Sequence, residues 1–136
     1  MVPKIILLVC DKRSRNDFSK AMKEALAREK IPCAFAWCET YRQGIDYVNG
    51  TGFPDFIVVE LNAGDTNGGI TLLRHVRDVG KPTPVIIWNA RFTQDEAGQI
   101  AELNGINIAW HQPRALFRLS RYATMLLRGQ PRAHAP

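Results

Sequence analysis

Five short apolar runs, each followed by an amphipathic stretch, constrain the fold of this chain more than any other feature. The runs occupy residues 4–10, 33–38, 55–61, 85–88 and 106–110. Continuous apolar runs of this length are typical of strands in a parallel sheet that is covered on both faces. The amphipathic stretches between them are typical of the covering helices. We therefore predict a three-layer α/β domain in which five parallel strands and five helices are joined by right-handed crossovers.

Residues that commonly cap helices mark several of the predicted helix ends. Thr40 and Thr93 precede the second and fourth amphipathic stretches, and Glu96 completes a capping box with Thr93. Ser14 is the candidate N-cap of the first stretch. Gly105 follows the fourth stretch, where a left-handed residue often ends a helix. We expect the last helix to bury one apolar face made of Leu116, Leu119, Ala123, Leu126 and Leu127.

The chain length of 136 residues fits one domain, which we place at residues 1–129. Residues 130–136 are rich in proline and alanine and are expected to be a disordered tail. The first apolar run is far shorter than a membrane span and no signal peptide is evident, so we expect a cytoplasmic protein without membrane contact. The three cysteines lack zinc-site spacing and are expected to be reduced thiols.

Polar side chains stand at the point where each predicted strand ends. In a doubly wound sheet, binding sites form beyond the carboxyl ends of the strands, so these side chains are the candidate site residues. They are Asp11, Glu39, Glu60, Asn62, Asn89 and Gln112. The sequence therefore predicts that any chemistry takes place at this end of the sheet.

At these strand ends the chain resembles a known family, the receiver domains of bacterial response regulators, over about residues 3–128. The resemblance is carried by residues 54–61 followed by 69–77, by residues 84–90, and by Gln112-Pro113, where the family has Lys-Pro. It implies a flavodoxin-like (βα)5 fold and a role in two-component or phosphorelay signalling. It also implies a cis peptide bond between Gln112 and Pro113, a form that is largely confined to bonds before proline.

The site residues depart from the pattern of that family. The resemblance places Glu60 at the phospho-accepting Asp, Asn89 at a Thr or Ser, and Gln112 at the Lys. Cys10 and Asp11 stand where the family has two acids. A carboxylate displaced by about 1 Å can lose on the order of 10²-fold in rate. We therefore predict a degenerate, non-catalytic receiver that needs no cofactor and acts as a protein-interaction module.

Two interpretations of Glu60 remain open. Its longer carboxylate either mimics a phosphorylated aspartate, which requires a tight contact with Gln112 or Asn89, or is simply tolerated. Magnesium prefers oxygen ligands in octahedral geometry. A weak magnesium site could therefore form from Asp11, Glu60 and the backbone carbonyl of Asn62.

The last helix suggests a surface for a partner. Arg114, Arg118, Arg121 and Arg128 share one helical face by their spacing, and are either a docking stripe or a solvated face. Trp110 is a candidate interface anchor. The resemblance implies partner contacts on the fourth helix, fifth strand and last helix. We therefore expect another signalling protein there (a histidine kinase, a regulator or an output domain), or a second copy, rather than nucleic acid.

Three rival functions remain open. The first is a receiver that is still phosphorylated, with Glu60 or Asp65 as an unconventional acceptor. The second is a flavodoxin-like enzyme or nucleotide binder, although residues 64–69 carry glycines without a Walker pattern. The third is a nucleic-acid-binding domain, which the net charge of +5 permits without requiring it.

Overall fold

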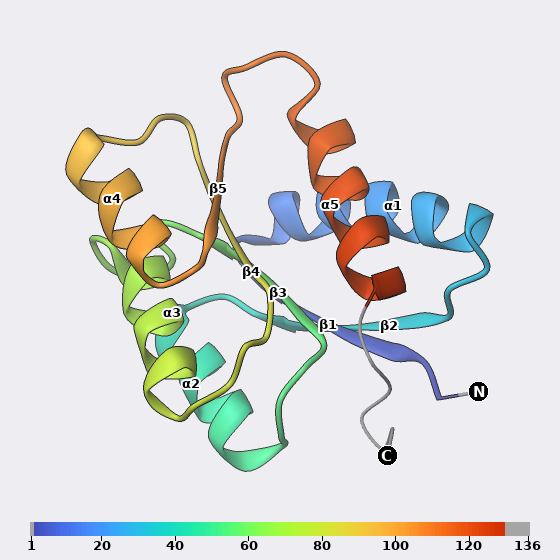
Figure 1. Ribbon diagram of the computed structural model, residues 1–136, viewed down its shortest axis with the longest axis horizontal. Helices are drawn as coiled ribbons and strands as arrows, with labels where there is room; N and C mark the ends of the chain where they lie inside the picture. The colour runs from blue at the N-terminus through green and yellow to red at the C-terminus, as the bar shows by residue number, and fades with distance from the viewer. Residues whose placement is uncertain (1, 130–136) are drawn as a thin grey trace.

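The computed structural model describes residues 2–129, which form ten alternating strands and helices (Figure 1). In chain order they are β1 (Lys4–Val9), α1 (Lys12–Arg28), β2 (Cys33–Cys38), α2 (Tyr41–Gly50), β3 (Phe56–Glu60), α3 (Gly68–Asp78), β4 (Val85–Asn89), α4 (Gln94–Glu102), β5 (Ile106–Ala109) and α5 (Ala115–Gly129). Residues 130–136, predicted to be a disordered tail, lie outside the described residues.

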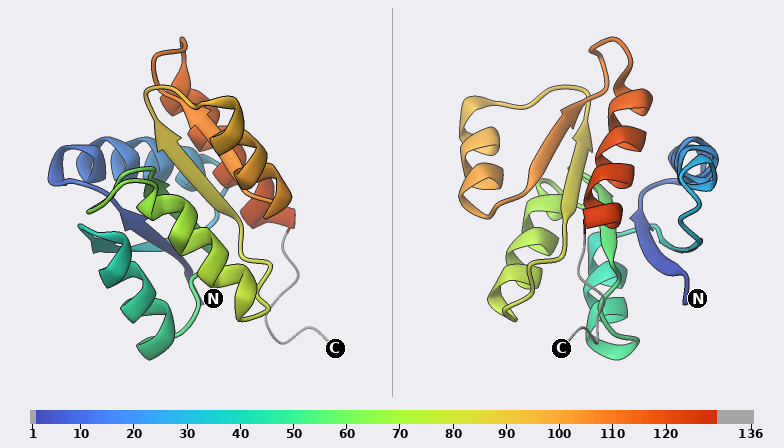
Figure 2. Two further views of the ribbon diagram at one scale, coloured as in Figure 1. Left: turned by 90° about the vertical axis from the view of Figure 1, so that its left-hand side faces the viewer. Right: turned by 45° about the vertical axis from the view of Figure 1, so that its right-hand side comes forward.

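The five strands form one parallel sheet in the order β2-β1-β3-β4-β5. Helices α1 and α5 cover one face, and α2, α3 and α4 cover the other (Figure 2). This is the predicted flavodoxin-like, doubly wound arrangement with three layers. No described helix has both the length and the apolar character needed to cross a membrane. The cytoplasmic location stays a prediction.

Alternate residues of each central strand enter two separate cores. In β1, Leu8 packs with Phe18 and Leu119 beneath α1 and α5, whereas Leu7 packs with Leu72 on the opposite face. Both β1 leucines are 0% exposed. Burying such a side chain contributes about 1.5–3 kcal/mol, which explains why the central strands read as unbroken apolar runs.

The predicted caps at Thr40 and Thr93 are confirmed, because each forms a complete capping box. Helix α1 differs, since its N-cap is Asp11 and not Ser14. The Asp11 carboxylate accepts a hydrogen bond from the Ser14 backbone N–H at 2.7 Å. The helix therefore begins directly at the end of β1, and this brings its first turn into the candidate site.

Helix α4 also ends differently from the prediction. Asn104, not Gly105, takes the left-handed conformation, with a φ of 54°. Gly105 is closely packed instead, because a Cβ there would approach Leu73 Cδ2 to 2.6 Å and Ile100 Cγ2 to 2.9 Å, and these side chains would have to shift. The turn into β5 thus depends on close contact between α3 and α4.

Arg77 of α3 ties this turn to the loop before β4. Its Nε donates to the carbonyl of Leu103 at 2.7 Å, and its Nη1 donates to the carbonyls of Lys81 and Thr83, both at 2.8 Å. One guanidinium therefore satisfies carbonyls from two connections at the amino ends of β4 and β5. Such bonds hold both strands in register.

Candidate functional site

The carboxyl ends of the strands open into a surface groove of about 640 Å³. Side chains from β3, from the starts of α1 and α5, and from the connection after β5 line it. They include Asp11, Ser14, Glu60, Trp110, Gln112 and Phe117. The structure therefore brings the predicted residues Asp11, Glu60 and Gln112 to one groove, together with the candidate anchor Trp110.

Glu60, the last residue of β3, is bound to the start of α1. Its Oε1 accepts a hydrogen bond from the Asp11 backbone N–H at 2.8 Å, and its Oε2 accepts one from the Ser14 hydroxyl at 3.4 Å. Glu60 is half-buried. Burial raises the pKa of Glu60, the Asp11 N–H opposes that rise, and the nearby Asp11 carboxylate adds to it.

These bonds complete a cap that one segment cannot make alone. In a capping box, a Glu or Gln at the third helical position reaches back to the N-cap N–H. In α1 that position is Ser14, whose side chain is short. Glu60 takes this role from a strand 49 residues further along the chain. An aspartate at position 60 would be one methylene shorter, so the longer acid suits this contact.

Cys10 stands where the resemblance places the first acid, and it is fully buried. Burial and the negative charges of Glu60 and Asp11 raise the pKa of its thiol, which therefore stays neutral. The carbonyl of Cys10 accepts a hydrogen bond from Trp37 Nε1 at 2.9 Å. All three cysteines are free thiols, as expected. This position supplies no charge to the groove.

Asn89 and Gln112 interact elsewhere and not with Glu60. The Asn89 side-chain amide donates to the carbonyl of Arg91 at 2.7 Å. The Gln112 side-chain carbonyl accepts from Arg118 Nη1 at 3.0 Å. Neither makes a hydrogen bond with Glu60 in the described part of the chain, so the mimic interpretation gains no support from these two residues.

The carboxylates of two residues predicted for a magnesium site, Asp11 and Glu60, already accept hydrogen bonds, whereas of Asn62 it is the side chain and not the predicted backbone carbonyl that is bound. Asp11 and Glu60 accept hydrogen bonds from the start of α1, and the Asn62 side-chain oxygen accepts from the Asn67 N–H at 3.0 Å. Among residues 2–129, no three His, Cys, Asp or Glu side chains gather as metal ligands would. Weak magnesium binding stays a prediction.

The peptide bond between Gln112 and Pro113 is trans, so the predicted cis bond is wrong; the described residues contain no cis peptide. The connection reverses direction at Arg114 instead, which has a φ of 65°. The Arg114 carbonyl then accepts the Arg118 N–H at 2.9 Å as α5 begins. A left-handed residue thus stands between the trans bond and the start of α5.

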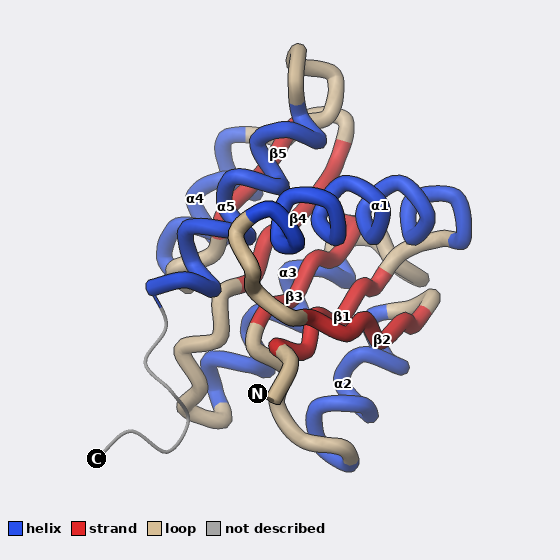
Figure 3. Tube along the Cα trace, turned by 90° about the vertical axis from the view of Figure 1, so that its right-hand side faces the viewer, coloured by secondary structure: helices blue, strands red, loops and turns tan. Residues whose placement is uncertain are grey.

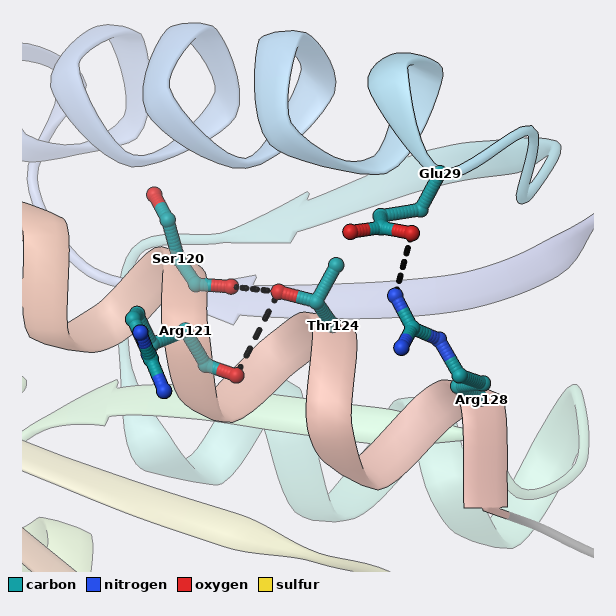
Figure 4. A network of polar contacts seen from close by, with 5 residues as sticks. All are labelled: Glu29, Ser120, Arg121, Thr124 and Arg128. Atoms are coloured by element: carbon teal, nitrogen blue, oxygen red, sulfur yellow. Dashed lines mark hydrogen bonds and ion pairs between the residues drawn. The ribbon is translucent and has the colours of Figure 1, made fainter.

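The four arginines predicted to form one stripe are used in three different ways. The guanidiniums of Arg114 and Arg121 lie over the Phe117 ring, at 4.5 Å and 6.0 Å from its centroid. Arg118 reaches Gln112 at the groove. Arg128 forms an ion pair with Glu29 of α1 (Figure 4). The stripe is therefore not a uniform row of free charges.

An exposed apolar cluster on α5 was missed by the sequence reasoning. Phe117 is 48% exposed and Met125 is 59% exposed. Leu116, predicted to be buried, is 38% exposed. The helix buries a stripe at intervals of four instead, made of Ala115, Leu119, Ala123 and Leu127. The signal was present, because Leu116 and Phe117 both lie outside that stripe. Leu116, Phe117 and Met125, together with Trp110, which is 53% exposed, form what we call the α5 surface.

Several solved structures with a similar fold are response regulators or their receiver domains. The chain is 22% identical to the signal receiver domain of a putative LuxO repressor protein from Vibrio parahaemolyticus, with a TM-score of 0.72, covering 93% of this chain and 92% of that one. It is 18% identical to the phosphorylated cyanobacterial phytochrome response regulator RcpA, with a TM-score of 0.74 and coverages of 96% and 98%. A two-component response regulator from Clostridium difficile is 18% identical, with a TM-score of 0.71 and coverages of 98% and 100%.

Neither a protein-family model nor a curated protein matches the chain. The structural likenesses cover nearly the whole described chain and establish that it has the flavodoxin-like fold of response regulator receiver domains. At these identities, likeness shows the fold, and function has to be argued from the site itself.

Proposed function

We propose that this protein is a degenerate receiver-like domain that acts as a protein-interaction module in two-component or phosphorelay-type signalling, without phosphotransfer. The observation that carries the proposal is the engagement of Glu60 with the start of α1. The Glu60 carboxylate, at the position of the phospho-acceptor, accepts hydrogen bonds from the Asp11 N–H and the Ser14 hydroxyl. These bonds fix the start of α1 and give the carboxylate a structural role.

The chemistry of phosphoryl transfer supports this proposal. Transfer depends on positioned charge, because a metal ion and cations stabilise the negative charge that spreads over the moving phosphoryl group. At this site Cys10 is a buried neutral thiol, and Gln112 carries no charge. The side-chain oxygen of Gln112 accepts a hydrogen bond from Arg118, so this arginine already has a partner. Arg13 and Arg114 also line the groove, but the positions that the resemblance assigns to the first acid and to the lysine carry no charge here.

The direct test is incubation of the purified protein with acetyl phosphate and magnesium, followed by intact-mass measurement. We expect no added phosphoryl mass. A stable phosphoryl adduct on the wild-type chain would overturn the proposal. Fragmentation of such an adduct would then assign it to Glu60 or to Asp65, the acceptors of the rival interpretation.

The α5 surface supports an acidic protein as the partner. Phe117 is exposed and is flanked by the guanidiniums of Arg114 and Arg121. Helix α5 contains no acidic residue, and neither arginine makes an ion pair with a described residue. Exposed aromatic and arginine side chains are the groups that most often anchor interfaces. An acidic signalling protein would supply the missing carboxylates.

The partner proposal is tested by changing this surface in a binding measurement. Partners captured by the wild-type chain from native lysate are identified, purified and titrated against Phe117→Ser and Arg121→Glu. We expect each change to weaken binding at least about tenfold. Arg74→Glu on α3 makes the same charge change on the other face of the sheet and is the matched control. Equal losses for Arg74→Glu and Arg121→Glu would contradict the assignment.

A further inference from the structure

Strand β2 forms an edge of the sheet with an unusual composition for that position. All six of its side chains, Cys-Ala-Phe-Ala-Trp-Cys, are apolar or thiol, and none is charged. None of them is fully buried, whereas β1, β3 and β4 are mostly buried. Figure 3 shows β2 beside β1 at the end of the sheet, with no described strand beyond it.

The outer edge of β2 presents free main-chain groups. Lys4 N–H donates to the Pro32 carbonyl at 2.8 Å, and Cys10 N–H donates to the Cys38 carbonyl at 3.0 Å. Both acceptors have even numbers, and the direction of the main chain alternates along a strand. The odd residues, 33, 35 and 37, therefore direct their N–H and C=O groups away from β1. No described strand pairs with them.

Edge strands usually carry a device that prevents pairing with another chain. Lysine, proline and bulges are the common ones. Strand β2 contains none of them, and its pairing with β1 is regular over all six residues. The opposite edge strand, β5, has only four residues, and one of them is the exposed polar Asn107. The two edges therefore differ, and β2 is the one suited to pairing.

We propose that β2 pairs antiparallel with β2 of a second copy of this chain, around a two-fold axis at Phe35. This register places Cys33 opposite Trp37 of the second copy and Phe35 opposite Phe35. All three pairs then join residues whose main-chain groups point outward, which is the requirement for hydrogen-bonded antiparallel pairs. A shift by one residue would set outward groups against inward ones, so it is excluded.

Charges at the two ends of β2 favour the same arrangement. Exposed Lys30 precedes the strand, and exposed Glu39 follows it. Antiparallel pairing around Phe35 brings Lys30 of one copy within one residue of Glu39 of the other, twice in each dimer. Parallel pairing would bring like charges together instead. A two-fold contact of this kind is self-complementary and stops at the dimer.

The inference does not depend on the proposed function, because β2 lies at the edge opposite β5. The homodimer predicted through α4, β5 and α5 would use the other edge and stays a prediction. Edge pairing buries less area than a standard interface, so we expect dimers at protein concentrations on the order of 0.1 mM.

Sedimentation of two matched variants tests which edge is used. Ala34→Lys adds a charge at an exposed position of β2, and Asn107→Lys adds the same charge at an exposed position of β5. We expect Ala34→Lys to be monomeric, and Asn107→Lys to dimerise like the wild type. A wild type that is monomeric at about 0.5 mM overturns the proposal. Dissociation of Asn107→Lys alone would also overturn it.

Hydrogen exchange of individual amides tests the register without any substitution. At low concentration the even-numbered amides of β2 are protected by β1, and the amides of residues 33, 35 and 37 exchange freely. As the dimer forms, we expect exchange at these three amides to slow by at least about tenfold. A dimer in which they still exchange freely would overturn the proposal, because its contact would lie on another surface.

Discussion

At Glu60, one carboxylate joins the end of β3 to the first turn of α1. Its hydrogen bonds to the Asp11 N–H and the Ser14 hydroxyl satisfy groups that an ordinary helix start satisfies locally. Asp11 in turn caps the Ser14 N–H. The acids at this site thus hold two segments together, and this physical role explains why a longer acid stands at the strand end.

Glu60→Ala tests this role by removing the acceptor while leaving the Asp11 N–H in place. We expect a loss of about 1–2 kcal/mol in the free energy of unfolding, because a half-buried donor loses its partner. Urea unfolding measures it. Glu39→Ala changes an exposed acid that follows β2 and should cost less than about 0.5 kcal/mol. Equal effects for the two variants would contradict the capping role.

The pH dependence of stability gives a second test at this residue. The pKa of Glu60 is raised in the folded state above its ordinary value of 4.5, mainly by burial. The folded chain therefore binds the Glu60 proton more tightly than the unfolded chain does. The stability that this proton contributes is fully present below the unfolded pKa and is lost as pH rises through the folded pKa. Relative to Glu60→Gln, the wild type should lose stability as pH rises from about 4 to 7. A gain over that range would contradict the raised pKa.

At the scale of elements, a single side chain can join two of the loops that connect helices to strands. Arg77 binds carbonyls of Leu103, Lys81 and Thr83 and so joins α3 to the connections that precede β4 and β5. Phe117 rises from the first turn of α5 beside Arg114. Arg77 thus links the connections that lead into β4 and β5.

Arg77→Ala is expected to lower the free energy of unfolding by roughly 2 kcal/mol, because several carbonyls lose a charged donor. Arg77→Lys should recover little, since an ammonium cannot reproduce the planar fork that serves separate carbonyls. Thermal unfolding compares both with Arg74→Ala, which removes one exposed hydrogen bond to Gln99. If Arg74→Ala lost as much stability as Arg77→Ala, the proposed role of the Arg77 hydrogen bonds would be contradicted.

Elements that are determined by interactions within a short stretch of the chain could be predicted from the sequence. The central strands β1, β3 and β4 are mostly buried and read as apolar runs, and the caps at Thr40 and Thr93 act within one turn. The start of α1 at Asp11 also has a local cap, but Ser14 was chosen as the N-cap instead; the bond from the Asp11 N–H to Glu60 in a distant strand could not be predicted. The trans bond before Pro113 was missed because a turn at Arg114 replaced it. Of the site, Asp11, Glu60 and Gln112 were found together, whereas Phe117 was overlooked.

At the scale of the whole molecule, the chain presents three surfaces that a partner or ligand could contact. The groove above the strand ends holds Glu60 and Gln112, the α5 surface presents Phe117 beside it, and the β2 edge lies beyond β1. Receiver-fold structures are similar over nearly all of this chain. At the site, however, Glu60 is hydrogen-bonded to the start of α1, and Cys10 and Gln112 carry no charge. The chain thus has the receiver fold, and we propose that it lacks the chemistry of phosphoryl transfer.

Phosphoryl uptake by the wild type and by a restored variant tests this proposal most directly. The variant carries Cys10→Asp, Glu60→Asp, Asn89→Thr and Gln112→Lys, and both proteins are incubated with acetyl phosphate and magnesium while intact mass is followed. We expect the wild type to stay unmodified and the variant, if it folds as circular dichroism reports, to gain phosphoryl mass. Uptake by the wild type at a rate equal to or above that of the folded variant would contradict the account.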